Sequence, residues 1–155
     1  MLPNKSILGW REWVGLPKLG IPLLKAKIDT GARSCALHTF SLETFDRDGT
    51  QWLRFDLHPI QMRQDIVVRA EAPIIDQRLV TDSGGHQEYR YFIQTDLTIA
   101  GKNFTTEISL TTRDTMRFRM LIGRNALNGR FTVDPEQSYM SGEHSKSRVV
   151  KLYRQ

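Results

Sequence analysis

Short bursts of apolar and β-branched residues, separated by turn-forming residues, run through almost the whole of this sequence. Strands that recur at intervals of about ten residues are typical of an all-β sandwich or barrel. No long segment repeats its apolar residues at helical spacing, so we predict an all-β fold. The expected strands are Ile7–Leu16, Ile21–Ile28, Leu37–Phe45, Trp52–Leu57, Ile66–Ala70, Arg78–Thr81, Tyr89–Ile99, Phe104–Leu110, Met120–Ile122 and Phe131–Val133.

The segments between these strands contain the Gly and Asp residues that tight turns need for positive φ. The predicted turns are Pro17–Gly20, Asp48-Gly49, Ser83–Gly85 and Ala100–Lys102. The one expected helix is Asn125–Gly129, because its last residue can adopt the left-handed conformation of a helix cap. We predict one domain over residues 1–140 and a polar C-terminal tail over residues 141–155.

The composition fits one folded domain and limits its partners. The 155 residues are 39% hydrophobic, which is enough for a single core. No window approaches the ~18 apolar residues of a membrane span, the N-terminus lacks the features of a signal peptide, and the lone Cys35 cannot form an internal disulfide. We therefore expect a cytoplasmic protein with no membrane partner. The net charge of +5 favours an anionic partner, but no Arg-rich run with interleaved aromatic residues predicts direct nucleic-acid binding.

The triplet Asp29-Thr30-Gly31 directly follows the apolar segment Ile21–Ile28. Gly31 allows a sharp turn, and the Thr30 hydroxyl can fix the loop through hydrogen bonds. Two such carboxylates that face each other share one proton, so one can act as a base toward water while the other polarises a carbonyl group. Because the same triplet is a common turn composition, it also fits an ordinary junction between a strand and a turn.

Several segments taken together resemble the retropepsin-like aspartic peptidases of bacteria, the RimB-like group. They are Gly9–Val14, Lys27–Ser34, Met120–Arg124 and Phe131–Pro135, within a resemblance that runs from Ile7 to about Tyr139. The resemblance implies an all-β, closed or partly open barrel of six or more strands, of the acid-protease type, with one short helix. It also implies that the Ile122-Gly123-Arg124 segment packs beside the Asp29 loop, and that a flap at about Gln77–Tyr91 closes over the substrate.

The same resemblance implies an aspartic endopeptidase that trims poly-glutamate tails from a small-subunit ribosomal protein. Asp29, Thr30 and Gly31 would be its catalytic residues, and Ala32 would contact the substrate. Asp82-Ser83-Gly84 is a second candidate triplet, but it lies only 53 residues after Asp29 and no apolar-apolar-Gly segment follows it. We predict a hairpin turn there. One chain then supplies one Asp, so the predicted enzyme is a homodimer in which two-fold symmetry brings the two copies together.

A substrate rich in glutamate would repel catalytic carboxylates, so a site built for it needs guanidinium groups nearby. Each candidate Arg could instead be an ordinary solvated strand residue. Arg124 is expected to form a structural ion pair near the dimer interface rather than a substrate contact. The predicted substrate-binding residues are Arg33 first, then Arg78 and Arg90, with Arg69 and Arg63 as weaker candidates.

No cofactor and no metal are predicted, although the RimB-like group has been labelled as ATP-dependent zinc proteases. The sequence has no His-Glu-x-x-His segment and no Gly-x-x-x-x-Gly-Lys-Ser/Thr phosphate loop. Cys35 and His38 are two possible zinc ligands where a structural site needs four, and His58, His86 and His144 are scattered. Two alternatives stay open: a non-catalytic β-barrel module that binds an acidic or nucleic-acid ligand, and a zinc hydrolase.

Overall fold

The computed structural model describes residues 5–82, 84–112 and 117–154. The strands within these ranges are β1 (Ser6–Leu8), β2 (Arg11–Leu16), β3 (Ile21–Ile28), β4 (Cys35–His38), β5 (Ser41–Arg47), β6 (Thr50–Leu57), β7 (Val68–Pro73), β8 (Asp76–Thr81), β9 (Gln87–Ile99), β10 (Lys102–Thr111), β11 (Met120–Ile122) and β12 (Phe131–Val133). The helices are the 3₁₀ turn η1 (Pro17–Leu19) and the α-helices α1 (Arg124–Leu127) and α2 (Lys146–Tyr153).

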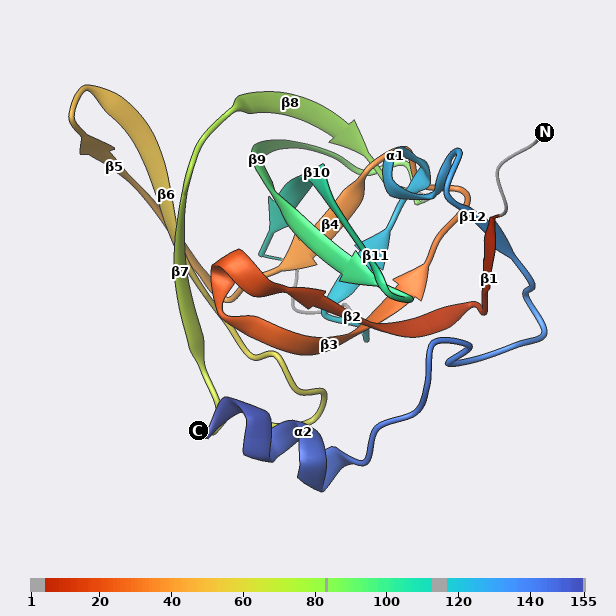
Figure 1. Cartoon of the computed structure of the whole chain (residues 1–155). Coiled ribbons are helices and arrows are strands. Elements are labelled where there is room, and N and C mark those ends of the chain that lie inside the picture. The colour runs from red at the N-terminus through yellow and green to blue at the C-terminus, as the bar shows by residue number, and fades with distance from the viewer. Residues whose placement is uncertain (1–4, 83, 113–116, 155) are drawn as a thin grey trace.

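Six of these strands close into a barrel, which lies at the centre of Figure 1. The order around the ring is β10-β4-β11-β3-β2-β9, and β9 pairs back with β10 in antiparallel register. β8 extends the sheet outward from β9 as the first arm of a hairpin. β5, β6 and β7 form a separate three-stranded sheet, and β1 pairs with β12 at another edge. The predicted all-β barrel is confirmed.

The predicted turns adopt the backbone conformations that their residues favour. Asp48 and Gly49 have φ angles of 51° and 81° between β5 and β6, and Ala100 and Gly101 have 51° and 77° between β9 and β10. Two consecutive residues with positive φ match the right-handed twist of the flanking strands. These two turns therefore set the register of the hairpins. The predicted turn at Ser83 itself lies outside the described residues.

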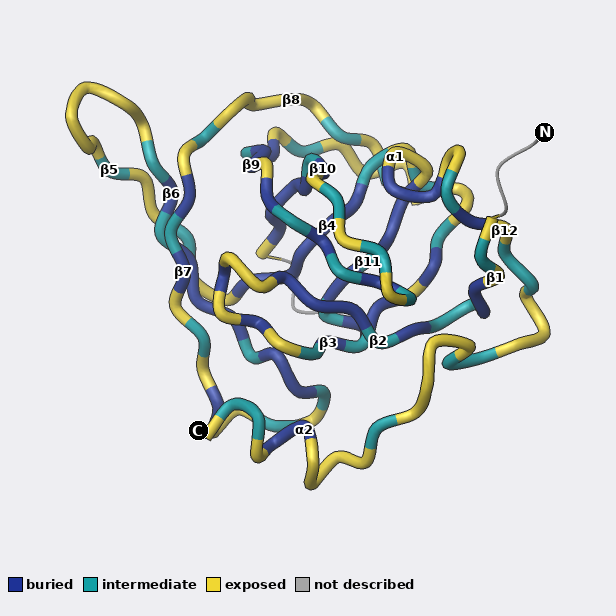
Figure 2. The backbone as a smooth tube through the Cα atoms, in the orientation of Figure 1, coloured by how far each residue is buried: buried dark blue, intermediate teal, exposed yellow. Residues whose placement is uncertain are grey.

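The core fills the barrel because the strands alternate inward apolar and outward polar side chains (Figure 2). In β3, Leu24, Ala26 and Ile28 are buried, whereas Lys25 and Lys27 lie on the outer face. The largest fully buried side chains belong to several strands of the ring and to β6, where Phe55 is completely buried. The β5–β6–β7 sheet therefore shares its inner face with the barrel core.

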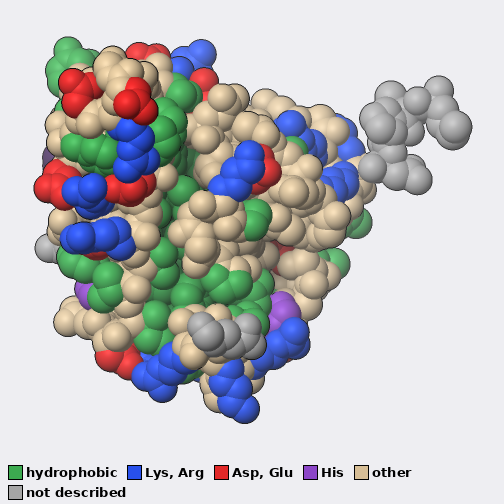
Figure 3. Space-filling model, turned by 60° about the vertical axis from the view of Figure 1, so that its left-hand side comes forward, with side chains coloured by type: hydrophobic (Ala, Val, Ile, Leu, Met, Phe, Trp, Pro, Cys, Tyr) green, Lys and Arg blue, Asp and Glu red, His purple; other side chains and the backbone are tan. Residues whose placement is uncertain are grey.

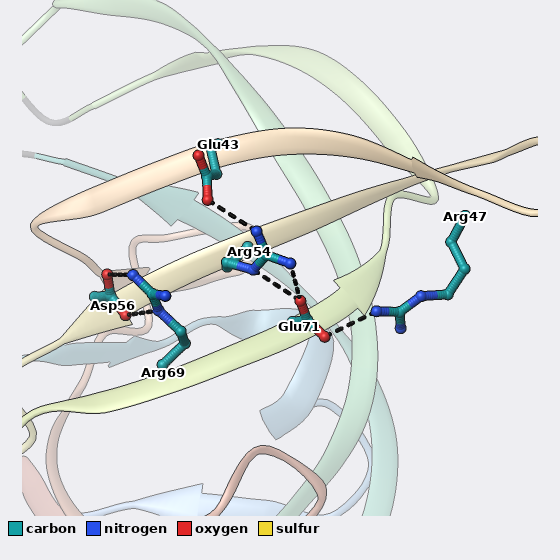
Figure 4. Close-up of polar contacts among 6 residues, drawn as sticks. All are labelled: Glu43, Arg47, Arg54, Asp56, Arg69 and Glu71. Atoms are coloured by element: carbon teal, nitrogen blue, oxygen red, sulfur yellow. Dashed lines mark hydrogen bonds and ion pairs between the residues drawn. The ribbon is translucent and has the colours of Figure 1, made fainter.

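The outer face of the β5–β6–β7 sheet is a network of paired charges, visible as adjacent blue and red side chains in Figure 3 and in detail in Figure 4. Arg54 donates to Glu71 at 2.8 Å and to Glu43 at 3.1 Å. Arg69 donates to both carboxylate oxygens of Asp56, at 2.8 and 3.1 Å, and these bonds lower the pKa of Asp56 below its usual value. Arg69 could therefore contact a substrate, as predicted, only by giving up its ion pair with Asp56 on the outer face of the sheet.

Two predicted strands divide where another segment meets the backbone. The expected strand Ile7–Leu16 breaks into β1 and β2 because the chain bends at Gly9, where an added Cβ would lie 2.2 Å from the carbonyl oxygen of Gln137. The amide of Trp10 donates to that same carbonyl at 2.8 Å. The close approach leaves room only for glycine. Similarly, the expected strand Leu37–Phe45 divides into β4 and β5.

The C-terminal segment packs against the barrel and contains a helix that the sequence did not predict (Figure 1). Ser145 begins α2 by accepting a hydrogen bond from the amide of Arg148. Val149 and Val150 of α2 pack with Ile60 and Ile66, and the hydroxyl of Tyr153 donates to the carbonyl of Leu23 at 2.6 Å. Residues 146–153 are thus an ordered helix within the span predicted as a tail.

Candidate functional site

The Asp29 loop begins where two parallel strands end together. β3 and β11 pair in parallel register up to Ile28 opposite Ile122, and the amide of Asp29 donates to the carbonyl of Ile122 at 2.9 Å. The Asp29 side chain then accepts the amide of Gly31 at 3.1 Å, and its carbonyl accepts the amide of Ala32 at 3.1 Å. The carboxylate is therefore fixed by its own turn, partly exposed at the end of a buried strand.

The segment after β11 packs tightly against the second half of this loop, as the family resemblance implied. A Cβ added to Gly123 would lie 2.5 Å from the backbone of Ser34, so only glycine allows this approach. The amide of Arg124 donates to the carbonyl of Ala32 at 2.9 Å, and that of Asn125 donates to the carbonyl of Arg33 at 3.1 Å. Two chain segments that are about ninety residues apart in sequence thus form one structural unit.

Arg124 differs from its expected role. Its guanidinium donates to the carbonyl oxygen of Thr30 at 3.1 Å, and it forms no ion pair with another residue in the described ranges. Among the described residues, the ion pair predicted for Arg124 near the dimer interface has no partner within the same chain, and a partner from a second copy stays a prediction. The side chain instead holds the peptide between Thr30 and Gly31 in place.

Asn125 connects the loop to the barrel wall and was missed in the sequence. Its Oδ1 atom accepts from the Cys35 thiol at 3.3 Å, and its Nδ2 atom donates to the carbonyl of Glu107 at 3.0 Å. Burial raises the pKa of Cys35 to about 11, with a smaller opposing effect of a hydrogen bond from the backbone of Gly123. The thiol is therefore protonated at neutral pH. An Asn in a short helix gives no sequence signal for such a role.

The three predicted substrate-binding arginines have different surroundings. Arg33 is exposed, and its side chain forms no ion pair with any residue that the structure describes. Arg78 donates to Glu107 at 2.8 Å and also pairs with Asp76. Arg90 is buried, pairs with Glu88 and contacts Ser109. Arg33 is thus the one of the three whose guanidinium lies open to solvent without an acidic partner in the described ranges.

The hairpin of β8 and β9 has the shape predicted for the flap region. Asp82 forms the turn that joins the two strands, because its Oδ1 atom accepts the amides of Gly84 and His86, each at 2.9 Å. The prediction that Asp82 is a turn residue is confirmed. Since Arg78 on β8 pairs with Glu107, and the carbonyl of Glu107 accepts from Asn125, the hairpin is tied to the Asp29 loop through β10.

Neither a metal centre nor a membrane helix emerges from the described parts of the chain. No group of three or more His, Cys, Asp and Glu side chains within residues 5–82, 84–112 and 117–154 is placed to hold a metal ion. No helix in these ranges is long and apolar enough to cross a membrane.

A protein-family model described as "RimB-like: Retropepsin-like aspartic endopeptidase RimB" matches residues 7–144. The chain belongs to the RimB-like family. A structure of protein Lpg0085 from Legionella pneumophila, a protein of unknown function, superposes on 90% of this chain and 100% of its own length with a TM-score of 0.74. At 24% sequence identity, that similarity concerns the fold alone. The retropepsin-like fold inferred from the sequence motifs is thus confirmed.

Curated relatives carry a different name. The chain is 40% identical over 153 residues to a "Probable alpha-L-glutamate ligase" of Shewanella pealeana. It is 41% identical over 149 residues to a protein of the same name from Desulfotalea psychrophila. These matches cover 99% and 96% of this chain but only 33% and 32% of the relatives. The chain therefore spans about a third of the length of the curated relatives that it matches.

These names contradict the activity expected from the sequence. A ligase forms the bond to glutamate, whereas the expected aspartic-type peptidase would hydrolyse such a bond, so the prediction of a hydrolase that trims poly-glutamate tails is wrong. The described chain also holds a single Asp-Thr-Gly loop, at Asp29, because Asp82 forms a hairpin turn. The roles assigned to Asp29, Thr30, Gly31 and Ala32 remain predictions about a site, without the peptidase reaction attached to them.

Proposed function

We propose that this chain serves α-L-glutamate ligation as a barrel that binds the glutamate-bearing peptide. The observation that carries the proposal is the match of almost the whole chain, at about 40% identity, to one third of proteins named probable α-L-glutamate ligases. Forming a peptide bond requires an activated carboxylate, and this chain spans only about a third of the length of those relatives, which leaves two thirds for other steps. We therefore assign peptide binding, rather than activation of the carboxylate, to this barrel.

The Asp29 loop offers two complementary charges to such a peptide. The partly exposed carboxylate of Asp29 can accept hydrogen bonds from an amino group or a backbone amide, and the exposed guanidinium of Arg33 can hold a glutamate side chain in a bidentate pair. Arg78 is tied to the loop through Glu107, whose carbonyl accepts from Asn125. Arg90 contacts Ser109, whose hydroxyl donates to the carbonyl of Cys35 just after the loop. In this proposal Arg33 is the main charged contact, and Arg78 and Arg90 are positioning residues.

A homodimer is part of the proposal, as is a location in the cytoplasm. Two-fold symmetry would place two Asp29 loops, and two copies of Arg33, along one glutamate-rich peptide or the tail of one ribosomal protein. Sedimentation velocity with and without peptide tests this part, and a single monomeric species under both conditions would remove the dimer from the proposal. The reduced state of the lone Cys35 in the cytoplasm agrees with its burial and raised pKa.

Calorimetric titration with a peptide of six glutamates tests the binding function. We expect the glutamate peptide to bind and a peptide of six glutamines to bind much more weakly. Arg33→Ala should weaken binding of the glutamate peptide about tenfold, the effect of losing one charge-assisted pair. Arg148→Ala is the matched control, because Arg148 is also exposed but lies on α2. Equal affinity for the two peptides, or equal losses in the two variants, would refute the proposal.

A further inference from the structure

One surface of the protein gathers several cations that have no acidic partner in the described residues. The arginines of the β5–β6–β7 sheet pair with carboxylates (Figure 4), and Arg78 and Arg90 of the β8–β9 hairpin do the same, so these regions carry no local excess of positive charge. On the outer face of β2 and β3 and at the start of α2, by contrast, four cations have no acidic partner in the described ranges. We call this set, Arg11, Lys25, Lys27 and Lys146, the cationic strip.

Strand register gathers the cationic strip on one side of the β2–β3 pair. Arg11 lies opposite Lys27, and Trp13 lies opposite Lys25. Because side chains alternate along a strand, Arg11 and Trp13 of β2 and Lys25 and Lys27 of β3 all lie on the outer face of the pair. Glu12, the one acidic residue of β2, points inward and is completely buried. The outer face of this strand pair is therefore positively charged with no carboxylate of its own strands on it.

Aromatic rings lie between these cations. The Arg11 guanidinium lies 4.7 Å from the ring centroid of Trp10 and 4.9 Å from that of Tyr139. The Lys25 ammonium lies 5.4 Å from the ring centroid of Trp13, which in turn stacks with Tyr139 at 6.3 Å. Cations held over rings keep fixed positions. Such a surface could not be read as a run in the sequence, because two strands and the C-terminal segment each contribute part of it.

A pocket opens at one end of the cationic strip. Its volume is about 180 Å³, and Trp13 and His144 form walls at the point where Lys25 and Lys146 flank it. The remaining lining residues are Pro59, Ile60, Gln61, Met62 and Val149. The pocket thus combines apolar and aromatic walls with two cations at its sides.

We propose that the cationic strip and its pocket bind single-stranded nucleic acid. Phosphates would pair with Arg11, Lys25, Lys27 and Lys146, and one base would enter the pocket against Trp13. Cations along a groove, combined with aromatic rings on which bases stack, are the features by which proteins bind single strands. A glutamate chain has the charge to match the cations but no flat apolar group for the pocket. The pocket therefore favours nucleic acid over an acidic peptide.

Fluorescence anisotropy with a labelled single-stranded RNA of twelve nucleotides tests the proposal. If all four cations neutralise phosphates, the logarithm of the affinity should fall with the logarithm of salt concentration with a slope of about −2.8. The double variant Lys25→Ala/Lys27→Ala should lower the affinity about tenfold and reduce the slope to about −1.4. Lys5→Ala/Lys18→Ala is the matched control, because it removes the same charge from exposed lysines elsewhere.

A DNA strand of the same sequence and a peptide of twelve glutamates complete the experiment. RNA and DNA binding that both depend on the cationic strip support the proposal, and the ratio of the two affinities identifies the preferred sugar. Trp13→Phe should weaken binding of the RNA and leave binding of the glutamate peptide unchanged. Glutamate binding that is at least as tight and as sensitive to Lys25→Ala/Lys27→Ala would overturn the proposal. So would equal RNA affinities in the strip and control variants.

Discussion

Replacing Glu12 by Gln is expected to lower the free energy of unfolding by about 1–3 kcal/mol. The Glu12 carboxylate is completely buried and accepts four hydrogen bonds. One oxygen accepts the amides of Gly9 at 2.7 Å and Met140 at 2.9 Å. The other accepts the amide of Ser141 at 3.0 Å and its hydroxyl at 2.8 Å. Glutamine can keep its oxygen toward Gly9 and Met140 and place its NH₂ group beside Ser141, whose hydroxyl can turn to accept from it. The amide of Ser141 then loses its acceptor, and a buried unpaired donor costs about 1–3 kcal/mol.

Urea unfolding followed by tryptophan fluorescence measures this loss. Glu143→Gln is the matched control, because Glu143 is exposed in the same C-terminal segment and its replacement should change stability by less than about 0.5 kcal/mol. The Glu12→Gln variant should also become more sensitive to proteolysis near Met140, since the carboxylate holds residues 140 and 141 against β2. A loss below about 0.5 kcal/mol in Glu12→Gln would refute the reasoning that this carboxylate anchors the segment.

Three further outcomes follow from the site and the outer sheet. Gly123→Ala should lower the free energy of unfolding by about 1–3 kcal/mol, because the added Cβ meets the Ser34 backbone. Urea unfolding measures this loss, and a loss well below about 1 kcal/mol would contradict the prediction. The Cys35 thiol, with a pKa of about 11, should resist iodoacetamide at pH 8 in the native protein but react in urea, as mass spectrometry would reveal. Because Arg69 lowers the pKa of Asp56, stability from this pair is complete above the ordinary Asp value and is lost as pH falls through the lowered one. Asp56→Asn should therefore flatten the decline of stability below about pH 4 in urea titrations, and an unchanged slope would contradict it.

Family membership concerns the fold of this chain, whereas the names of the curated relatives concern the activity of longer proteins. The family model and the barrel describe the fold in which the Asp29 loop lies. The ligase names describe proteins about three times as long as this chain. A binding role for the barrel accommodates both findings, because a loop that presents Asp29 and Arg33 can hold a peptide without performing the bond-forming step.

Local sequence features predicted much of the barrel. β3, β11 and β12 have the ends that the apolar bursts indicated, since alternation of buried and exposed side chains is a local property. The turns at Asp48-Gly49 and Ala100-Gly101 were predictable for the same reason. Helix α2 was not, because its burial depends on Ile60 and Ile66, which are distant in the chain.

The candidate site divides in a similar way. Asp29-Thr30-Gly31 stood out because a sharp turn after an apolar strand requires particular residue types. The approach of Gly123 to the loop was expected from the family resemblance, and the structure gives its physical reason. The ion pair between Arg78 and Glu107 and the hydrogen bonds by which Asn125 connects the loop to the barrel wall could not be predicted from the sequence. Both depend on which strands become neighbours in the fold.

The sequence by itself determined the all-β class, the turns and the position of the Asp29 loop, because these depend on residues close together in the chain. Only the tertiary structure decided which cations are paired and which are not. Strand register placed Arg69 beside Asp56 but left Lys25 and Lys27 together on a face without carboxylates. A net charge of +5 is a property of composition. The grouping of Arg11, Lys25 and Lys27 on the outer face of β2 and β3 is a property of the fold, because burying Glu12 leaves that face to the cations.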